Sequence, residues 1–282
     1  AVFRLMSFRD LFRVRCTCRA FHALADAALR RLPRPVMFDT RRPFALSFST
    51  GEWSPLAPYP RVRDDFACCS YGSGFVVLGG GEADDDGVLW QDEISTSVIV
   101  LRDDGWHELP DLPEPRSGCA VAVVDDAIFA LGGKDSDWVD QDSVLRLAPG
   151  AAAWETVGSG LIEPRCFPAT CTLPDGRLVV VGGSRQNPES AELFDFRSCT
   201  SSPLPSLNEA RSAYASAVML SDSTVLVHGL GTGAYSNGDP PPETLDISRP
   251  DARFVKDFPP MLDRSGLCPH IAFKDESGCV QV

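Results

Sequence analysis

The chain has 282 residues, of which 44% are hydrophobic, so it can bury a core of ordinary size in one large domain or two smaller ones. Glycine and proline, 23 of each, are spread over turn-like positions, which favours an all-β body made of many short strands. The formal net charge of −13 argues against nucleic acid as a partner, and the lack of any run of 18 apolar residues argues against a membrane span.

The cysteine pattern and the N-terminus indicate a reducing compartment. No succession of charged, apolar and small residues marks a secretory signal at the N-terminus. Most of the ten cysteines lie inside apolar patterns, and no two have CxxC spacing. Small buried thiols of this kind are common in reduced proteins, so we expect a protein of the cytoplasm, the nucleus or both.

Residues 1–34 are expected to form a helical segment that is distinct from the rest of the chain. They carry eight arginines against Asp10 and Asp26, and Ser7-x-x-Asp10 has the form of a capping box. Apolar residues then recur with helical spacing from Leu11 to Leu24.

This pattern resembles the last two helices of an F-box, with 5–18 as linker and second helix and 21–32 as the third helix. The resemblance implies docking to the adaptor of a cullin-RING ubiquitin ligase. The first half of an F-box is not in this sequence, and an ordinary amphipathic helical cap would show the same periodicity. On the F-box interpretation, the adaptor-binding residues are Val2, Phe3, Leu5, Leu11, Phe12, Val14, Cys18 and Phe21.

Residues 35–282 consist of repeats with a period of about 50 residues. Each unit has an apolar strand that ends in Gly-Gly, a polar loop, a strand pair with an aromatic residue, and a Pro-rich turn followed by Arg. The Gly-Gly ends are FVVLGG at 75–80, IFALGG at 128–133 and LVVVGG at 178–183, with VLVHGLG at 225–231 as a degenerate fourth. The aromatic residues are Trp53, Trp106, Trp154 and Phe254, and the recurrent arginines are Arg61 or Arg63, Arg116, Arg165, Arg211 and Arg264.

The register of Gly-Gly, aromatic residue and Arg resembles the kelch motif, and RSAYASAVMLSDSTVLVHG with AELFDF resembles its galactose-oxidase-like form. The resemblance implies a kelch-type β-propeller, in which four-stranded blades surround a central channel. The residues agree with it independently, because strands such as 119–124 and 127–131 are apolar on both faces, as expected between neighbouring blades. Asp125-Asp126, Pro174-Asp175-Gly176 and 221–223 are the expected hairpin turns.

The strand pattern predicts five blades. Outer strand pairs are expected at 44–56, 94–109, 143–157, 191–204 and 244–258, and inner pairs at 65–78, 117–131, 166–181, 212–228 and 265–282. The first outer pair and the last inner pair would combine into one composite blade, which removes both free edges. The alternative is a truncated six-bladed propeller, because kelch propellers more often have six or seven blades.

The expected binding site lies where the D-to-A and B-to-C connections emerge, because strands in a blade alternate in direction. A guanidinium near the axis presents a planar set of donors to a carboxylate or phosphate, so several of them would suit an acidic peptide. Each Arg could equally bind backbone carbonyls and tie its blade to the next. The predicted substrate-binding residues are Arg61, Arg63, Arg116, Arg165, Arg211 and Arg264, with Trp90, Trp138 and Tyr235 as apolar anchors in polar loops.

No catalytic residue, metal or cofactor is expected. The four histidines fall in different layers of the expected fold, which disfavours a copper site: His22, His107, His228 and His270. The iron-site pattern Glu-x-x-x-Asp-x-x-x-His is begun by Glu82 and Asp86 but has Trp90 in the third place. Neither a Gly-rich phosphate loop nor a nucleophile elbow occurs.

These features lead to the hypothesis of a substrate-recognition subunit of an SCF-type cullin-RING ubiquitin ligase. The helical segment would bind the adaptor, and the propeller would hold a protein substrate. The alternatives are a stand-alone kelch scaffold for protein interactions and a divergent propeller enzyme with a small ligand in the channel. The identity of the substrate does not follow from the loops.

Overall fold

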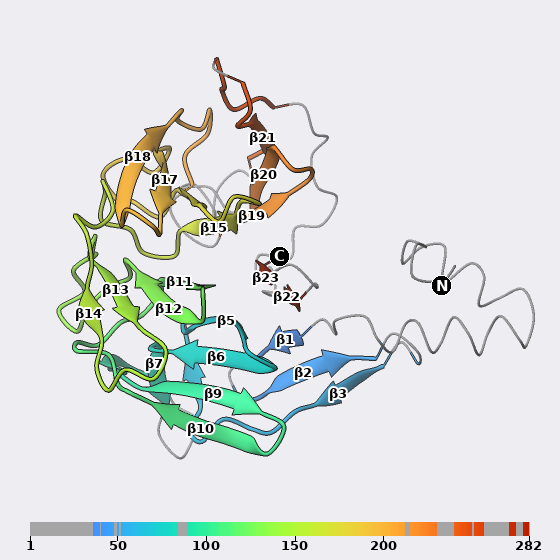
Figure 1. The fold of residues 1–282 in the computed structure, drawn as a ribbon, viewed down its shortest axis with the longest axis vertical. Coiled ribbons are helices and arrows are strands. Elements are labelled where there is room, and N and C mark those ends of the chain that lie inside the picture. Colours follow the sequence, from blue (N-terminus) through green and yellow to red (C-terminus); the bar gives the residue numbers. More distant parts are fainter. Residues whose placement is uncertain are drawn as a thin grey trace, which may run out of the picture.

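The computed structural model describes residues 36–39, 41–47, 50, 52–83, 89–211, 215–229, 240–249, 251–256, 271–274 and 279–281. For 82–83, 89–93, 271–274 and 279–281 this description covers the backbone alone. Within these residues the chain forms strands and no helix, and five of its sheets are the blades of a propeller around a common centre (Figure 1). The predicted five-bladed, all-β propeller is therefore confirmed, while the predicted helices of residues 1–34 lie outside the described part.

Blades 2, 3 and 4 are four-stranded antiparallel sheets, with their strands in chain order from the centre to the rim. Blade 2 consists of β5 (Ala67–Tyr71), β6 (Gly74–Leu78), β9 (Val98–Arg102) and β10 (Gly105–Leu109). Blade 3 consists of β11 (Ala120–Val124), β12 (Ala127–Leu131), β13 (Val144–Leu147) and β14 (Glu155–Thr156). Blade 4 consists of β15 (Ala169–Thr172), β16 (Leu178–Val181), β17 (Ala191–Asp195) and β18 (Thr200–Leu204).

Blade 5 has three strands and a short continuation. Its strands are β19 (Ala215–Met219), β20 (Thr224–Gly229) and β21 (Glu243–Asp246). Val255 extends the sheet outward through an isolated bridge to Thr244. The predicted outer pair at 244–258 is thus present as β21 and, among the described residues, as one further bridge at Val255.

Blade 1 combines both ends of the propeller sequence, as predicted. Its sheet has the order β23-β22-β1-β2-β3, with β1 (Val36–Phe38), β2 (Pro43–Leu46), β3 (Trp53–Pro55), β22 (Ile271–Lys274) and β23 (Cys279–Gln281). The joint is the antiparallel pairing of Val36 with Ala272. β1 was not predicted from the sequence, and with it this sheet has five strands. Its inner edge is β23, whereas the sequence placed the first strand of the last inner pair, now β22, at that edge.

A small additional sheet lies within blade 2. It joins β4 (Arg63–Asp64), β7 (Gly81–Ala83) and β8 (Leu89–Ile94), in that order. The predicted B-to-C loop at 81–93 is therefore mostly a hairpin, and β4 holds the connection into blade 2 against it.

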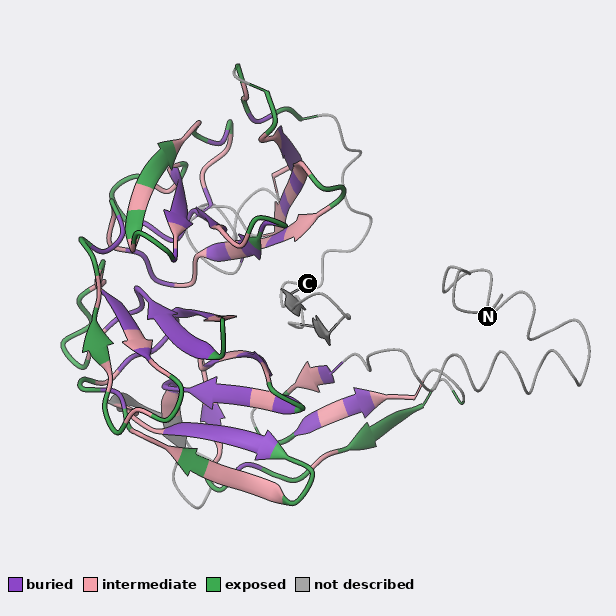
Figure 2. Cartoon of the chain, in the orientation of Figure 1, coloured by how far each residue is buried: buried purple, intermediate pink, exposed green. Residues whose placement is uncertain are grey.

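Successive residues of the inner strands face different neighbouring blades. Val179 packs in a cluster with Ala217 and Leu245 of blade 5, whereas Val180 packs in a cluster with Ala122 and Phe129 of blade 3. Burial falls off from the inner strands to the rim (Figure 2). Each buried Val or Leu contributes about 1.5–3 kcal/mol, so the inter-blade clusters are the main apolar source of stability.

Trp106 and Trp154 connect blades 2 and 3 to the end of the blade that precedes each. The Trp106 indole N–H donates a hydrogen bond to the carbonyl of Ala57 at 3.0 Å, and Trp154 does the same to Pro110 at 2.7 Å. In these two blades the aromatic position is therefore fixed by a polar contact as well as by packing.

The Gly-Gly corners form a second inter-blade joint. The N–H of the second glycine donates to the carbonyl of the Arg that begins the next blade: Gly80 to Arg116 at 2.8 Å, Gly133 to Arg165 at 2.7 Å and Gly183 to Arg211 at 2.9 Å. The first glycine of the corner is left-handed, with φ of 64° at Gly132. A Cβ at Gly132 would lie 2.6 Å from the Arg165 carbonyl oxygen, so only glycine fits there.

Gly132→Ala is expected to lower the free energy of unfolding by at least about 2 kcal/mol, because the new methyl group forces the joint apart in addition to the cost of a left-handed alanine. Gly150→Ala is the matched control, since Gly150 also has a left-handed φ of 72° but has open space around its Cβ position. That control is expected to lose about 1 kcal/mol. Urea unfolding followed by tryptophan fluorescence measures both, and equal losses would contradict the packing argument.

Candidate functional site

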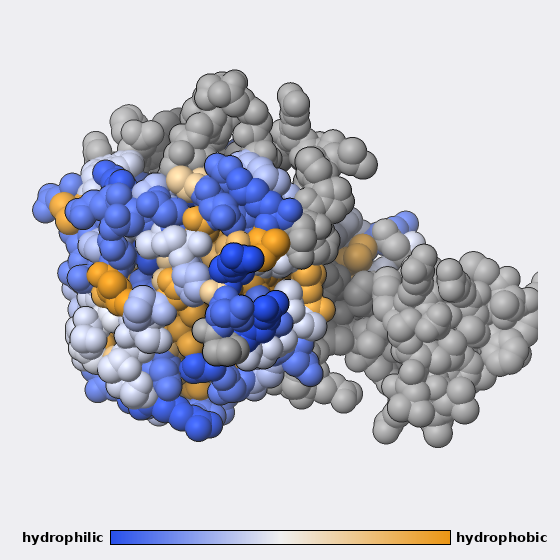
Figure 3. Space-filling view, turned by 90° about the horizontal axis from the view of Figure 1, so that it is seen from above, coloured by the Kyte–Doolittle hydropathy of each residue, from blue (hydrophilic) through white to orange (hydrophobic). Residues whose placement is uncertain are grey.

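The candidate site is the end of the propeller that we call the connection face. It comprises the described residues of the D-to-A connections 57–66, 110–119, 157–168 and 205–211 and of the B-to-C connections 79–97, 132–143 and 182–190. Both kinds of connection emerge at one end because neighbouring strands in each blade are antiparallel. Seen from the edge of the propeller, the described surface is mostly hydrophilic, with apolar residues in separate patches (Figure 3).

Four recurrent arginines of this face are buried, with at most 1% of each exposed: Arg63, Arg116, Arg165 and Arg211. Each Nη1 donates to a carbonyl at the corner where strand B of its own blade ends. The acceptors are Gly79 at 3.4 Å, Gly132 at 2.8 Å, Gly182 at 2.6 Å and Gly229 at 2.6 Å. Each Nη2 binds the segment just before strand C, at Ser97 Oγ (3.3 Å), Ser143 Oγ (2.6 Å), Ser190 Oγ (2.9 Å) and the Pro241 carbonyl (2.7 Å).

Carboxylates join this network in three blades. Glu192 accepts a hydrogen bond from Arg165 Nε at 2.6 Å, and both side chains are 1% exposed. Glu243 lies 3.9 Å from Arg211 Nη2 and is fully buried. In blade 3 the partly exposed Glu114 pairs with Arg116.

These contacts agree with the alternative in which each Arg binds backbone carbonyls, but the guanidinium connects strands B and C of its own blade and does not tie that blade to the next. A side chain that is buried on all sides and bound to internal carbonyls presents no surface to a partner, so we interpret Arg116, Arg165 and Arg211 as structural rather than as the substrate contacts that the sequence suggested. The predicted binding residue Arg264 lies outside the described residues.

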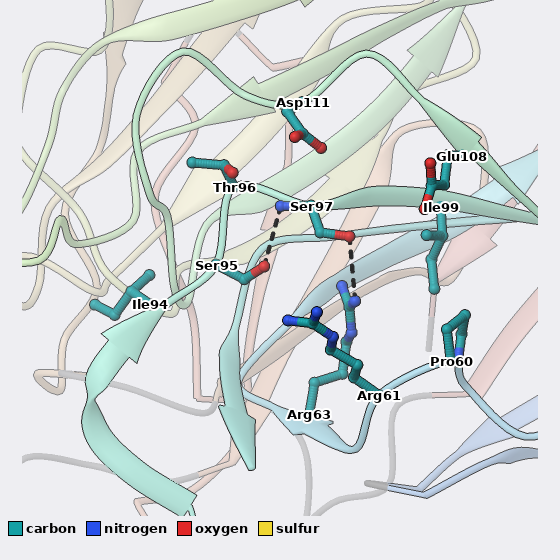
Figure 4. A pocket seen from close by; sticks show the side chains of 10 residues that line it. All are labelled: Pro60, Arg61, Arg63, Ile94, Ser95, Thr96, Ser97, Ile99, Glu108 and Asp111. Carbon is teal, nitrogen blue, oxygen red and sulfur yellow. Dashed lines mark hydrogen bonds between the residues drawn. The ribbon is translucent and has the colours of Figure 1, made fainter. Parts of the chain in front are cut away.

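Arg61 and Arg63 line a pocket of about 430 Å³ on the connection face. Arg61 is exposed, whereas Arg63 is buried and donates a hydrogen bond to Ser97 (Figure 4). Hydroxyl groups of 95–97 and the carboxylates of Glu108 and Asp111 complete the polar lining. Of the predicted binding residues, the structure brings these two together in one cavity.

Trp138 stands on the B-to-C loop of blade 3 with 38% of its surface exposed. Its backbone is left-handed, with φ of 63°, which is rare and strained for a bulky residue. Asp135 stabilises this loop because its carboxylate accepts hydrogen bonds from the backbone N–H groups of Asp137 (2.9 Å) and Val139 (3.0 Å). The loop therefore presents an aromatic ring in a fixed position.

The Lys134 ammonium lies over the face of the Trp138 ring, and this contact was not predicted from the sequence. Its Nζ lies 3.8 Å from the ring centroid of Trp138 and 5.6 Å from that of Phe167, and the residue is 8% exposed. A desolvated ammonium over an indole contributes about 2 kcal/mol. In the sequence, Lys134 is marked by its position directly after Gly132-Gly133. Its backbone pairs with Ser117, and this pairing holds Lys134 at the start of the loop.

The charge around Lys134 is mixed. Burial raises the pKa of Asp64, with a smaller effect of the nearby Asp65, and burial also raises the pKa of Asp140. The Lys134 charge acts in the opposite direction on the pKa of both carboxyls. Asp140 also pairs with Arg185 at 2.9 Å, so Lys134 belongs to a cluster of acidic and basic groups.

Trp90 lies on β8, where the description covers the backbone alone, and Tyr235 lies outside the described residues. The predicted adaptor-binding residues of the N-terminal segment also lie outside them.

Among the described residues, no group of three or more His, Cys, Asp or Glu side chains is arranged to hold a metal ion. Burial raises the pKa of the Cys119 thiol to about 11, of Cys166 to about 12 and of Cys171 to about 11, so these thiols are protonated at neutral pH. In the described part of the chain, no helix has the length and apolar character needed to cross a membrane.

Comparisons with known proteins agree with this architecture. The family model for the kelch motif matches residues 115–160, which include the Arg116 and Gly-Gly elements of blade 3. The solved structure of YjhT resembles this chain with a TM-score of 0.62 over 89% of the chain and 94% of its own, at 12% identity, and so shows the fold alone. Together the repeated corners, the blades and these matches support a kelch-repeat β-propeller.

Curated relatives share parts of the propeller. Kelch-like protein 35 of Mus musculus is 27% identical over 133 residues (46% of this chain, 19% of the relative), and Kelch-like protein 33 of Homo sapiens is 29% identical over 168 residues (56% and 29%). Kelch-like protein terF of Aspergillus terreus is 34% identical over 86 residues (30% and 18%). The chain thus spans less than a third of the length of these relatives.

Arg165→Lys is expected to lower the free energy of unfolding by about 3 kcal/mol, because an ammonium cannot reach Glu192, Gly182 and Ser190 together and leaves a buried carboxylate poorly paired. Arg146→Lys is the control, since Arg146 forms an exposed pair with Glu155 at 2.7 Å, and it should change stability by less than about 0.5 kcal/mol. Chemical denaturation measures both. Unchanged stability of Arg165→Lys would overturn the structural interpretation.

Cys119, Cys166 and Cys171 should resist iodoacetamide in the native protein at pH 8 and react after unfolding in urea. The raised pKa values keep the thiols protonated until the pH approaches about 11 or 12, and burial excludes the reagent. Peptide mass spectrometry after a timed labelling pulse reads each site. Labelling of the native protein at the rate of the unfolded chain would show that these thiols are accessible.

Proposed function

We propose that this propeller is a protein-binding module and that its connection face receives the partner. The observation that carries the proposal is Trp138, an exposed aromatic side chain held in a strained backbone conformation by Asp135 and Lys134. Tryptophan is enriched among the residues that dominate binding energy, and a side chain that is already fixed loses little entropy when the partner binds. Val139, 54% exposed beside it, extends the apolar contact.

The finer proposal is that the chain is the substrate-recognition subunit of an SCF-type cullin-RING ubiquitin ligase and is not itself an enzyme. The propeller would hold a protein substrate, and residues 1–34 would bind the adaptor. Two features support it: the helical pattern with F-box-like spacing at 5–32 and its position directly before a kelch propeller. On this proposal the protein works in the cytoplasm, the nucleus or both.

Trp138→Ala is expected to reduce partner capture by about 10- to 30-fold, which corresponds to the loss of a dominant aromatic contact. The measurement is quantitative affinity capture with the full chain, followed by a titration with the purified partner. Trp53→Ala is the matched control, because Trp53 is similarly exposed at 40% but lies on the outer strand β3. Equal capture by the Trp138 variant and the unmodified chain would remove this anchor.

The ligase proposal is tested by mixing the purified full chain with the purified cullin-RING adaptor. We expect a stable complex, and Leu11→Glu with Val14→Glu should abolish it because both residues lie on the predicted apolar helical face. Arg15→Glu, outside that apolar set, is the control. A folded chain that leaves the adaptor unbound would sink the ligase role but not the protein-binding role of the propeller.

A further inference from the structure

The B-to-C loop of blade 3 presents two exposed apolar residues between two exposed carboxylates. Trp138 and Val139 are 38% and 54% exposed, with Asp137 directly before them and Asp142 three residues after them. Both of these aspartates are exposed. Within the described part of the chain, neither carboxylate has a hydrogen-bond or ion-pair partner, so both negative charges are available to another molecule.

The next connection, 157–168, adds apolar surface beside this loop. The Leu161 N–H donates to the carbonyl of Asp142 at 2.7 Å, so Ile162, which is 50% exposed, lies next to the end of the loop. We call the exposed group on these two segments the Trp138 surface: Trp138, Val139, Ile162, Asp137 and Asp142. It holds three of the six large apolar residues that are exposed in the described part of the chain, the others being Trp53, Leu220 and Val255.

No cation nearby balances the charge of the Trp138 surface. The four connections of blades 3 and 4 on this face are described in full, and their arginines Arg116 and Arg165 are buried in the blade corners. Lys134 is buried beside the Trp138 ring. The one exposed cation of these connections, Arg185, pairs with Asp140 at 2.9 Å. The exposed Asp111 and Glu189 add further negative charge to the same connections.

We propose that the Trp138 surface binds a basic segment of the protein partner, in which an apolar side chain packs on Trp138 and neighbouring Lys or Arg side chains pair with Asp137 and Asp142. The inference rests on the proposed protein-binding function. It reverses the acidic partner that the recurrent arginines suggested, because the arginines of this region are internal and its carboxylates are at the surface. Complementary charge around an apolar contact mainly sets partner choice and the rate of association.

Lys134 determines which group of the partner covers the ring. Its ammonium already lies 3.8 Å from the ring centroid of Trp138. A second cation over the same ring would be repelled by the first and would compete for the same π electrons. The ring therefore suits an apolar side chain, and the partner's cations extend beyond the ring to the carboxylates.

The test uses the purified full chain and three blocked peptides. The first is acetyl-Gly-Arg-Leu-Arg-Gly-amide, the second has Glu in place of both Arg residues, and the third has Gly in place of Leu. In ligand-observed NMR titrations at low ionic strength, we expect the Arg-Leu-Arg peptide to bind at least about fivefold more tightly than either of the others. At about 1 M salt, where the screening length is about 3 Å, the preference over the Glu peptide should disappear and the preference over the Gly peptide should remain.

Two sets of substitutions separate the carboxylates from the ring. Asp137→Asn together with Asp142→Asn should remove the preference over the Glu peptide and keep the preference over the Gly peptide. Trp138→Ala should do the reverse. The matched control is Asp125→Asn with Asp126→Asn, which removes two exposed carboxylates from the A-to-B turn of blade 3, at the opposite end of the propeller. Asn tolerates the left-handed backbone of that turn, so both preferences should stay unchanged.

The outcomes distinguish this inference from the proposed protein-binding function. Binding of the Glu peptide that equals or exceeds that of the Arg peptide, no binding of any peptide, or a charge preference that survives Asp137→Asn with Asp142→Asn overturns the basic partner. Partner capture that Trp138→Ala weakens would then still support the protein-binding role. A charge preference lost in that double variant and kept in the control supports the basic partner, even where Trp138→Ala leaves capture unchanged. The thermal midpoint of each variant verifies folding.

Discussion

The fold depends on one polar requirement: in blades 2 to 5 the carbonyl groups at the end of strand B turn towards the interior and need hydrogen-bond donors there. A left-handed glycine makes the corner, and the arginine that begins the same blade supplies the donors. Because a guanidinium carries five N–H groups in one plane, a single side chain reaches both the corner and the start of strand C. The carbonyl of that arginine also accepts the hydrogen bond from the previous blade, so one residue closes a corner and a joint.

Because a buried arginine recurs at the same position in blades 2 to 5, its surroundings can be compared from one blade to another. Where the same buried cation recurs, the groups that balance its charge can be compared from blade to blade, much as equivalent positions are compared between relatives. Glu192 meets this need from strand C in blade 4, and Glu114 meets it from the preceding connection in blade 3. The loops differ more freely, since the loop that carries Trp138 is stabilised by its own Asp135 and not by a residue of the repeat.

Periodicity predicted the parts of the structure that depend on backbone conformation. Gly-Gly and Asp125-Asp126 require left-handed residues, and both sit where the pattern placed them. What the pattern left open was the direction of long side chains: Arg116 is compatible with pointing out to a ligand or in to a carbonyl, and the residues beside it do not decide between the two. The fixed ring of Trp138 depends on Asp135 and Lys134 in a loop without repeat, and β1 is too short for its pattern to be distinguished from a turn.

The composite blade has a kinetic consequence. Blades 2, 3 and 4 are each built from one contiguous stretch of chain, so their hairpins can form in succession as the chain emerges. The seam between Val36 and Ala272 instead closes a loop that contains nearly the whole propeller, and such remote contacts form slowly because much chain entropy is lost at once. Ring closure is thus the natural final event of folding, and until then the edge of β1 is open to other strands.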